Sequence, residues 1–270
     1  MNNLKNNYKY LPKDIRMINV TVINCTVLSV GTSNNNGGGG VQVKECTNPY
    51  LFNVTLINNT ANQGGGLCVF SAANNVILEK CTFIGNNAST NGGNIWAASS
   101  LLKIYDSVII GGSAENIGGG LYTNNLVYEN LTFINNTARI GGGLYWFKIN
   151  DKDTAKLING NTFINNTATE AGGAIYVPYK STITDNVFIG NNALNSANGG
   201  AIYISGNSAK VYNTNITSVT TNQSGGAIYI AGADAVIDGS KFEKNSANVS
   251  STGSGGSIYI KGNNAKISGS

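Results

Sequence analysis

The sequence predicts an all-β fold: a right-handed, single-stranded parallel β-helix of about nine coils, with three short strands in each coil. Two interleaved repeats and a near absence of helical patterning point to this fold. Both repeats recur at steps of about 27 residues, which is the length that one coil of short strands needs. A coil cannot bury its apolar side alone, so each coil has to stack on its neighbours.

The first repeat is a Gly-Gly pair followed by a variable residue, an aliphatic residue and an aromatic residue. The pair permits a sharp bend, and the residues after it are typical of a strand. Clear copies stand at 118–122, 141–145, 172–176, 199–203, 225–229 and 255–259, and weaker copies at 38–42, 64–68 and 92–96.

The second repeat is Phe-x-x-Asn, with copies that begin at Phe83, Phe133, Phe163, Phe188 and Phe242. Because the Asn always follows at the same distance, we expect these five rings to lie in one buried, stacked column. Asn tolerates left-handed backbone geometry at tight corners, and stacked Asn side chains can hydrogen-bond to one another as a ladder.

A third β-rich run precedes the second repeat in most periods, as at 76–79, 103–106, 126–129, 182–185 and 210–213. This run supplies the third strand of each coil. Leucine-rich repeats have a similar period, but their LxxLxLxxN pattern is missing. Connections between parallel strands are right-handed, which sets the expected sense of the helix.

Residues 1–17 lack the repeats, so we expect them to form a cap over the first coil or to be disordered. Residues 18–270 show no linker, which predicts a single β-helix repeat domain. No apolar segment of the signal-peptide type follows Met1, and the repeat is unfinished at Ser270. We therefore expect the chain to be a fragment of a longer surface protein.

The composition excludes several classes of function. Of the 270 residues, 44 are Asn, none is His and 11% are charged, against the ~25% that is usual. Without His there is no Ser-His-Asp or Cys-His catalytic device and no His-based zinc site. The net charge of +4 is scattered, so nucleic acid is not an expected partner, and no apolar run is long enough for a membrane-spanning helix. No cofactor is expected.

The paired motifs GGA(I/L/V) and FxxN resemble the repeats of chlamydial polymorphic outer membrane proteins. They are also similar to those of the Asn-rich, adhesin-like surface proteins of methanogenic archaea. The resemblance covers residues 37–260, with GGAI intact three times and FxxN five times. It implies an extracellular, cell-surface region used in attachment. Pectate-lyase-like enzymes share the coil pattern, but their acidic metal cluster and basic residue have no matching positions.

The best candidate for a binding site is an aromatic column with one ring in each of seven successive coils. If the aliphatic neighbours point into the core, alternation along the strand sends each ring outward, and the rings lie ~5 Å apart along the axis. Such a strip suits the apolar faces of sugars as well as protein partners. Alternatively, the rings only stack on one another, or a one-residue register shift turns them inward. The column comprises Trp96, Tyr122, Tyr145, Tyr176, Tyr203, Tyr229 and Tyr259.

Carboxylates are the only candidates for catalysis. Glu79 and Glu129 share a column with Asp238 and lie two coils apart on either side of Tyr105. Two coils correspond to ~10 Å, near the upper end of the separation used by inverting glycosidases. Surface carboxylates of this kind are usually solvated, so we expect no catalytic residue.

The sequence offers weaker candidates for a metal site and for a disulfide. Asn150, Asp151 and Asp153 offer oxygen ligands for Ca²⁺, but the Gly and distal Glu of an EF-hand loop are missing, so no metal site is predicted. Cys25 and Cys81 are assigned to one core-side column with a coil between them, too far apart for a disulfide. Cys46 and Cys68 lie on adjacent coils but are offset along the strand.

The function that the sequence favours is that of a non-catalytic, cell-surface adhesin-like β-helix that binds a carbohydrate or a partner surface. A polysaccharide lyase or hydrolase on the same fold is one alternative. A passive spacer that holds another domain away from the cell is the other. The absence of His and of a dense acidic cluster disfavours the enzyme.

Overall fold

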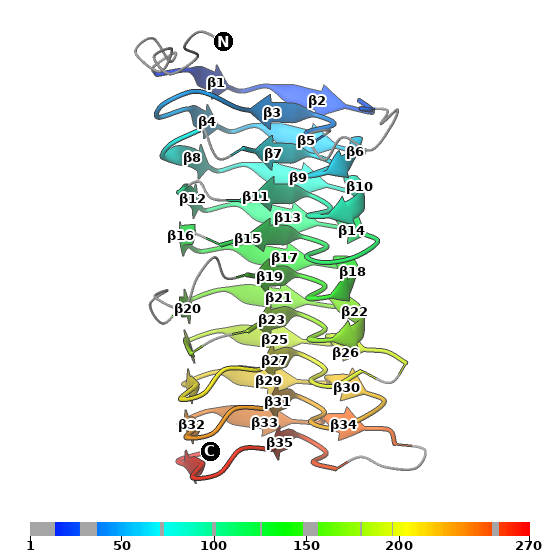
Figure 1. The fold of residues 1–270 in the computed structure, drawn as a ribbon, viewed down its shortest axis with the longest axis vertical. Helices are drawn as coiled ribbons and strands as arrows, with labels where there is room; N and C mark the ends of the chain where they lie inside the picture. Colours follow the sequence, from blue (N-terminus) through cyan, green and yellow to red (C-terminus); the bar gives the residue numbers. More distant parts are fainter. Residues whose placement is uncertain are drawn as a thin grey trace, which may run out of the picture.

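The computed structural model describes residues 14–27, 37–70, 73–98, 101–124, 126–147, 156–178, 180–195, 197–249 and 254–270. In these residues the chain is a right-handed parallel β-helix, which confirms the predicted fold class. The coils stack into a rod, with the first strands at one end and the last strands at the other (Figure 1). No helix long and apolar enough to cross a membrane occurs in the described ranges.

The Phe sheet is formed by the second repeat and has nine strands. From β5 to β29 the central residue of each three-residue strand is buried and its two neighbours face outward, because side chains alternate along a strand. The strands are β2 (Thr21–Ile23), β5 (Thr55–Ile57), β9 (Thr82–Ile84), β13 (Val108–Ile110), β17 (Thr132–Ile134), β21 (Thr162–Ile164), β25 (Val187–Ile189), β29 (Asn215–Thr217) and β33 (Lys241–Glu243).

The aromatic sheet is formed by the first repeat and also has nine strands. Here the outer two residues of each strand from β11 to β31 are buried and the central residue faces outward. The strands are β3 (Val41–Val43), β7 (Leu67–Val69), β11 (Ile95–Ala97), β15 (Leu121–Thr123), β19 (Leu144–Trp146), β23 (Ile175–Val177), β27 (Ile202–Ile204), β31 (Ile228–Ile230) and β35 (Ile258–Ile260).

The split sheet is formed by the third β-rich run. It consists of two five-stranded parts, and the chain between β19 and β20 is described only up to residue 147. The first part contains β1 (Arg16–Ile18), β4 (Tyr50–Phe52), β8 (Val76–Glu79), β12 (Leu102–Tyr105) and β16 (Leu126–Glu129). The second contains β20 (Lys156–Asn159), β24 (Ser181–Thr184), β28 (Lys210–Tyr212), β32 (Val236–Asp238) and β36 (Lys266–Ser268).

A fourth sheet, which we call the short-strand sheet, was not expected from the sequence. Its eight strands follow the position of the second-repeat Asn and consist mostly of Thr, Ala, Asn and Ser. Of these four residue types only Thr favours strands, whereas Asn and Ser are typical of turns. A typical coil therefore has four strands and not three. The strands are β6 (Thr60–Gln63), β10 (Asn87–Asn91), β14 (Ser113–Ala114), β18 (Thr137–Ile140), β22 (Thr167–Ala171), β26 (Asn192–Ala193), β30 (Thr220–Thr221) and β34 (Ser246–Ala247).

The core contains the predicted phenylalanine column. Four of these residues are buried, namely Phe83, Phe133, Phe163 and Phe188. The ring centroid of Phe163 lies 4.8 Å from that of Phe133 and 4.9 Å from that of Phe188. Phe242 is only partly buried, which corrects the expectation for this ring. It lies on β33, the last strand of the Phe sheet, so it is packed on one side only.

A buried ladder of Asn side chains runs beside the phenylalanine column. Side-chain amides in this ladder donate to the side-chain oxygen of the Asn in the next coil, for example Asn136 to Asn166 at 2.9 Å and Asn166 to Asn191 at 3.0 Å. The residue just before the ladder Asn makes the corner: Asn135 and Asn165 have φ of +54° and +52°. Asn thus plays both predicted roles, at adjacent positions.

The N-terminal segment is described in part. Residues 1–13 lie outside the described residues, so its nature as a cap or a disordered segment stays a prediction. Arg16 and Met17 belong to β1, which pairs in parallel with β4. The regular stack of strands therefore begins at residue 16.

Candidate functional site

The position of each outward aromatic ring depends on the Gly-Gly bend before it. At Gly172 the backbone has a φ of +61°, which side chains with a Cβ rarely adopt. At Gly173 a Cβ would lie 2.1 Å from the carbonyl oxygen of Gly200 in the next coil. The pair lets the chain turn sharply and lets neighbouring coils approach closely, and β23 then starts in a fixed register.

The seven predicted rings do point outward. Ile175 and Val177 are buried, and Tyr176 between them is partly exposed. The same pattern recurs in β11, β15, β19, β27 and β31. The strand pairings place Trp96, Tyr122, Tyr145, Tyr176, Tyr203, Tyr229 and Tyr259 directly above one another. We call these seven residues the aromatic strip.

The rings of the aromatic strip stack on one another. Neighbouring centroids lie 6.1 Å apart at Trp96–Tyr122 and 5.7 Å at Tyr122–Tyr145, and then 4.9 to 5.1 Å as far as Tyr259. From Tyr145 to Tyr259 the ring planes differ by only 2° to 15°. The predicted spacing near 5 Å is confirmed for the second half of the strip.

Two further rings extend the strip and were missed from the sequence. The centroid of Phe70 lies 5.5 Å from that of Trp96, and the centroid of Phe147 lies 4.4 Å from that of Tyr122. Each follows directly after a strand of the aromatic sheet, β7 or β19. An aromatic residue just beyond the first repeat was the signal that could have revealed them.

Stacking decides which part of each ring a ligand can reach. A Tyr inside the strip has a neighbouring ring on each of its two faces, so its faces are covered and only its edge and hydroxyl group point outward. A sugar therefore has no free ring face to stack on along the strip, contrary to the binding geometry expected from the sequence. The alternative of rings that stack on one another is what the geometry shows.

The strip offers neutral hydroxyl groups. Burial and, to a smaller extent, the neighbouring Tyr145 raise the pKa of Tyr122 to about 12. Burial also raises the pKa values of Tyr145, Tyr203 and Tyr229, again with help from adjacent tyrosines. These phenols stay protonated near neutral pH, so each can both donate and accept a hydrogen bond.

The carboxylates do not converge. Glu79, Tyr105 and Glu129 lie side by side in the predicted column, and the Tyr50 hydroxyl donates to Glu79 Oε2 at 2.8 Å. Asp238 lies on β32 in the other part of the split sheet, where it accepts a bond from the Ser268 hydroxyl at 2.8 Å. Within the described ranges no group of three or more Cys, Asp and Glu side chains lies close enough to hold a metal ion.

The cysteines are free, and one was assigned to the wrong column. Val22 of β2 pairs with Leu56, so Cys25, three residues later, falls opposite Asn59 and not in the column of Cys81. Cys25 is exposed at a corner and is not a core-side residue, whereas Cys46, Cys68 and Cys81 are buried. Residues Asn150, Asp151 and Asp153 lie outside the described residues.

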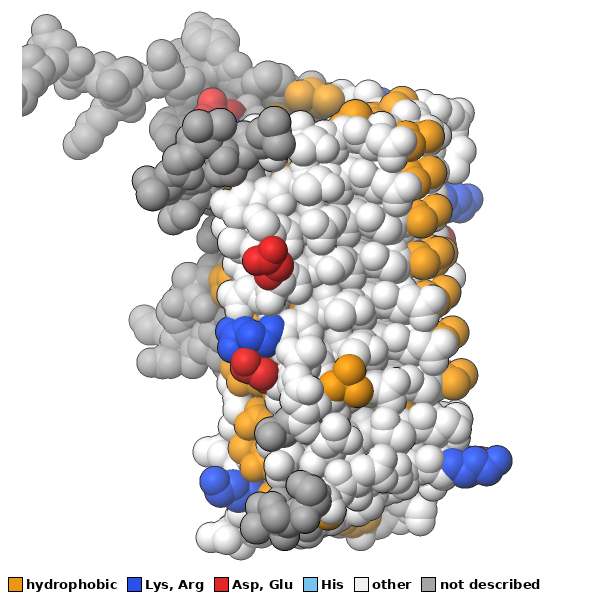
Figure 2. Space-filling view, turned by 90° about the vertical axis from the view of Figure 1, so that its right-hand side faces the viewer, with side chains coloured by type: hydrophobic (Ala, Val, Ile, Leu, Met, Phe, Trp, Pro, Cys, Tyr) orange, Lys and Arg blue, Asp and Glu red, His pale blue; other side chains and the backbone are white. Residues whose placement is uncertain are grey.

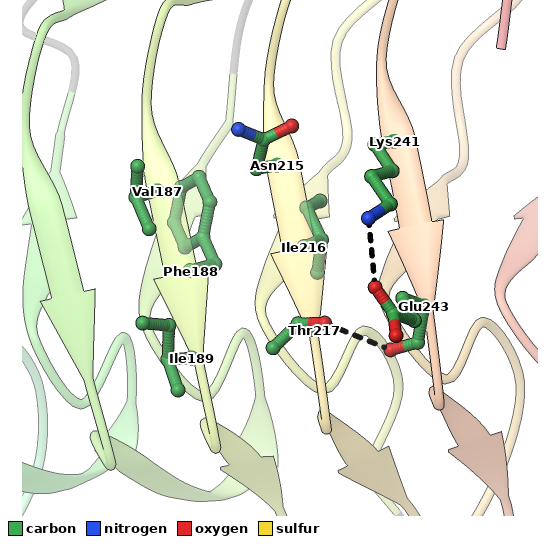
Figure 3. A pocket seen from close by; sticks show the side chains of 8 residues that line it. All are labelled: Val187, Phe188, Ile189, Asn215, Ile216, Thr217, Lys241 and Glu243. Atoms are coloured by element: carbon green, nitrogen blue, oxygen red, sulfur yellow. Dashed lines mark hydrogen bonds and ion pairs between the residues drawn. The ribbon is translucent and has the colours of Figure 1, made fainter.

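A hollow lies on another part of the rod, on the outward side of the Phe sheet near its last strands (Figure 3). Val187 and Ile189 form one wall. Lys241 and Glu243 form the other, with their charged atoms 2.9 Å apart. The smaller side chains of β29 leave the space between the walls. The only charged groups there neutralise each other, so the aromatic strip remains the candidate site.

The comparisons agree with the repeats. The family model for the Chlamydia polymorphic membrane protein repeat matches residues 162–178. This stretch contains one copy of each motif, from Phe163 and Asn166 to Tyr176 of the aromatic strip. The resemblance seen in the sequence is confirmed at this repeat, and it indicates a surface protein of the adhesin-like type. No curated protein and no solved structure matches the chain.

Proposed function

We propose that this chain is a non-catalytic, adhesin-like β-helix of the cell surface that binds an extended polysaccharide along its aromatic strip. One observation carries the proposal: a row of stacked phenol rings, repeated at 4.9 to 5.1 Å from Tyr145 to Tyr259. The match to a repeat of surface proteins supports the location. A row that repeats once per coil favours a ligand that repeats at the same interval.

The spacing distinguishes between polymeric ligands. In an extended peptide, side chains on one face repeat every ~6.6–6.8 Å, so a peptide running along the strip falls out of step with the coils. The length of one sugar unit in an extended 1,4-linked polysaccharide is close to the distance between neighbouring coils along the rod axis. Each sugar can then present its hydroxyl groups to one Tyr hydroxyl. Binding in this mode uses hydrogen bonds at the ring edges and needs no free aromatic face.

The arrangement gives no support to catalysis. General acid–base hydrolysis of a glycosidic bond needs two carboxyl groups on either side of the bond. Glu79 and Glu129 are separated by Tyr105, and they lie on the split sheet, away from the aromatic strip. We therefore expect a bound polysaccharide to be held and not cleaved, so incubation should release no reducing ends.

Removal of two hydroxyl groups tests the site while the stack is preserved. The variant Tyr203→Phe/Tyr229→Phe keeps both rings but loses two hydrogen-bonding groups, so binding to insoluble or immobilised polysaccharides should fall by roughly 5- to 100-fold. Tyr212→Phe is the matched control, because Tyr212 is also partly exposed and outward but lies on β28 of the split sheet. Unchanged binding by the double variant would show that the aromatic strip is not the binding site. If the wild type binds no polysaccharide, the chain is better described as a passive spacer.

A further inference from the structure

A second outward column, of isoleucines, runs along the Phe sheet. The strand pairings place Ile23, Ile57, Ile84, Ile110, Ile134, Ile164 and Ile189 above one another in seven successive coils. We call these seven residues the isoleucine ladder. Two positions earlier in each strand a Thr or Val faces the same way. Figure 2 shows a row of hydrophobic side chains that runs down one edge of the rod.

The ladder is exposed and free of charge. Its end members Ile23 and Ile189 are 50% and 38% exposed, and the five between them are partly exposed. No charged side chain occupies the outward positions of β2 to β25. Charge appears only at the far end of the sheet, where Lys241 and Glu243 lie on β33. Single exposed apolar residues are common, but an unbroken apolar column of this length marks an interaction surface.

The face is also regular. All strand pairs of the Phe sheet keep their three-residue register, whereas the short-strand sheet shifts register between Ala88 and Asn91 and between Ala138 and Ile140. A regular sheet face of β-branched side chains packs best against another sheet face, ~10 Å away. The partner that this fits is therefore a second flat sheet.

The size of the face agrees with a weak dimer. Seven strands span roughly 30–35 Å along the axis, and five residues from corner to corner span roughly 17 Å. Two such faces bury on the order of 1,100 Å² in total, which exceeds the ~1,000 Å² of a specific interface but stays below the ~1,600 Å² of a standard stable one.

We propose that the isoleucine ladder is a self-association face, on which two copies of this chain pack with their rod axes antiparallel. The two-fold axis lies along β13, the fourth of the seven strands, so that Ile110 faces Ile110 and Ile23 of one copy faces Ile189 of the other. The charged strand β33 then extends beyond the end of the other copy. With parallel axes related by a two-fold along the rods, β33 would face β33, so Lys241 and Glu243 of both copies would be buried in the interface, where the loss of their hydration offsets their attraction.

Sedimentation over a wide range of protein concentration tests the face. The wild type should show a reversible monomer–dimer equilibrium in the micromolar range, and Ile110→Lys/Ile134→Lys should weaken it at least ~10-fold. Val127→Lys is the control, because Val127 is 46% exposed on β16 of the split sheet. Circular dichroism checks that the variants are folded. A wild type that stays monomeric, or a control that weakens association equally, would overturn the proposal.

Thiol-specific cross-linking tests the antiparallel arrangement. In a Cys25→Ser background, Ile110→Cys should give a homodimer cross-linked by a short bismaleimide, since residue 110 lies at the axis and facing Cα atoms of two packed sheets are too far apart for a direct disulfide. Ile189→Cys should not link to itself but should link to Ile23→Cys in a mixture. The three remaining native thiols are buried, and burial raises the pKa of Cys68 to about 12, which keeps it unreactive. Self-linking at residue 189 would contradict the antiparallel arrangement.

Discussion

The side chain of Asn94 occupies the position in the buried Asn ladder that the next coil leaves empty. It stands in a Gly-Gly repeat, yet its side chain lies in the buried Asn ladder, where it accepts from Asn86 at 2.7 Å and donates to Asn136 at 3.1 Å. The coil between those two has Gly112 at the ladder position, and a Cβ there would lie 2.4 Å from the amide nitrogen of Asn94. Asn94 thus fills the space that the missing Asn leaves.

Replacement of this side chain should therefore break the ladder. In Asn94→Ala the amide of Asn86 loses an acceptor inside the core, so the free energy of unfolding should fall by ~1–3 kcal/mol in urea denaturation. Asn87→Ala, at an exposed position of β10, should change it by less than ~0.5 kcal/mol. Equal losses in the two variants would show that the ladder is not what stabilises this coil.

The tyrosines of the aromatic strip make stability sensitive to alkaline pH. A raised pKa means that the folded state holds the phenol proton when the unfolded state has already released it. The contribution is complete below the ordinary value of 10.0 and is lost as the pH rises towards the folded value of about 12 for Tyr122. Stability should fall over this window, and Tyr122→Phe should flatten the fall. Thermal unfolding of the wild type and of Tyr122→Phe at several pH values, with tyrosinate absorbance as a second signal, measures the fall in stability and its flattening. A melting temperature of the wild type that does not change with pH would contradict this prediction.

At the scale of the element, the Phe sheet holds the core together by stacking. The ring of Phe163 lies between those of Phe133 and Phe188, in almost parallel planes. Every strand is only three residues long, so a strand contributes little alone, and its stability comes from the coils on both sides. Stacked rings thus couple one coil to the next.

A large-to-small change at Phe163 should be severe. Phe163→Ala leaves a cavity between two rings and should lower the free energy of unfolding by ~3–5 kcal/mol. Phe242→Ala should have a smaller effect, because that ring is only partly buried at the end of the sheet. Urea denaturation measures the loss, and hydrogen exchange should show faster opening of β17, β21 and β25. A loss at Phe242 as large as that at Phe163 would count against the stacked core.

At the scale of the whole molecule, the rod separates its two outward columns. The aromatic strip lies on the aromatic sheet and the isoleucine ladder on the Phe sheet, with the short-strand sheet between them in the course of each coil. A packed core lies between them, and distant sites of this kind usually act independently. The same stack can thus present two surfaces without conflict.

This separation predicts that substitutions in one column leave the property of the other column unchanged. Ile110→Lys/Ile134→Lys should bind a short oligosaccharide with the wild-type affinity, and Tyr203→Phe/Tyr229→Phe should dimerise as the wild type does. A short ligand is needed, because a long polymer can gain avidity from a dimer. Calorimetric titration and sedimentation of both variants measure the two properties. A ladder variant that loses oligosaccharide binding would show that the two columns cooperate.

Much of this architecture follows from the sequence by itself. The period sets the length of one coil, and stacking of equivalent residues then places Phe133 on Phe163 and Tyr176 on Tyr203. Alternation along a strand is a local property, so the outward direction of Tyr176 could be predicted from Ile175 and Val177 alone. The binding role of the strip does not follow from this direction and stays a proposal.

Other features were decided only by the tertiary structure, because they depend on residues of neighbouring coils. The ring faces of Tyr203 are covered by Tyr176 and Tyr229, and no local pattern reveals how much of a ring its neighbours leave free. Asn94 enters the ladder only because Gly112 leaves room for it. The isoleucines became a continuous surface once the register of all coils was known. A repeat determines which residues stack, while packing between coils determines which surfaces remain for a partner.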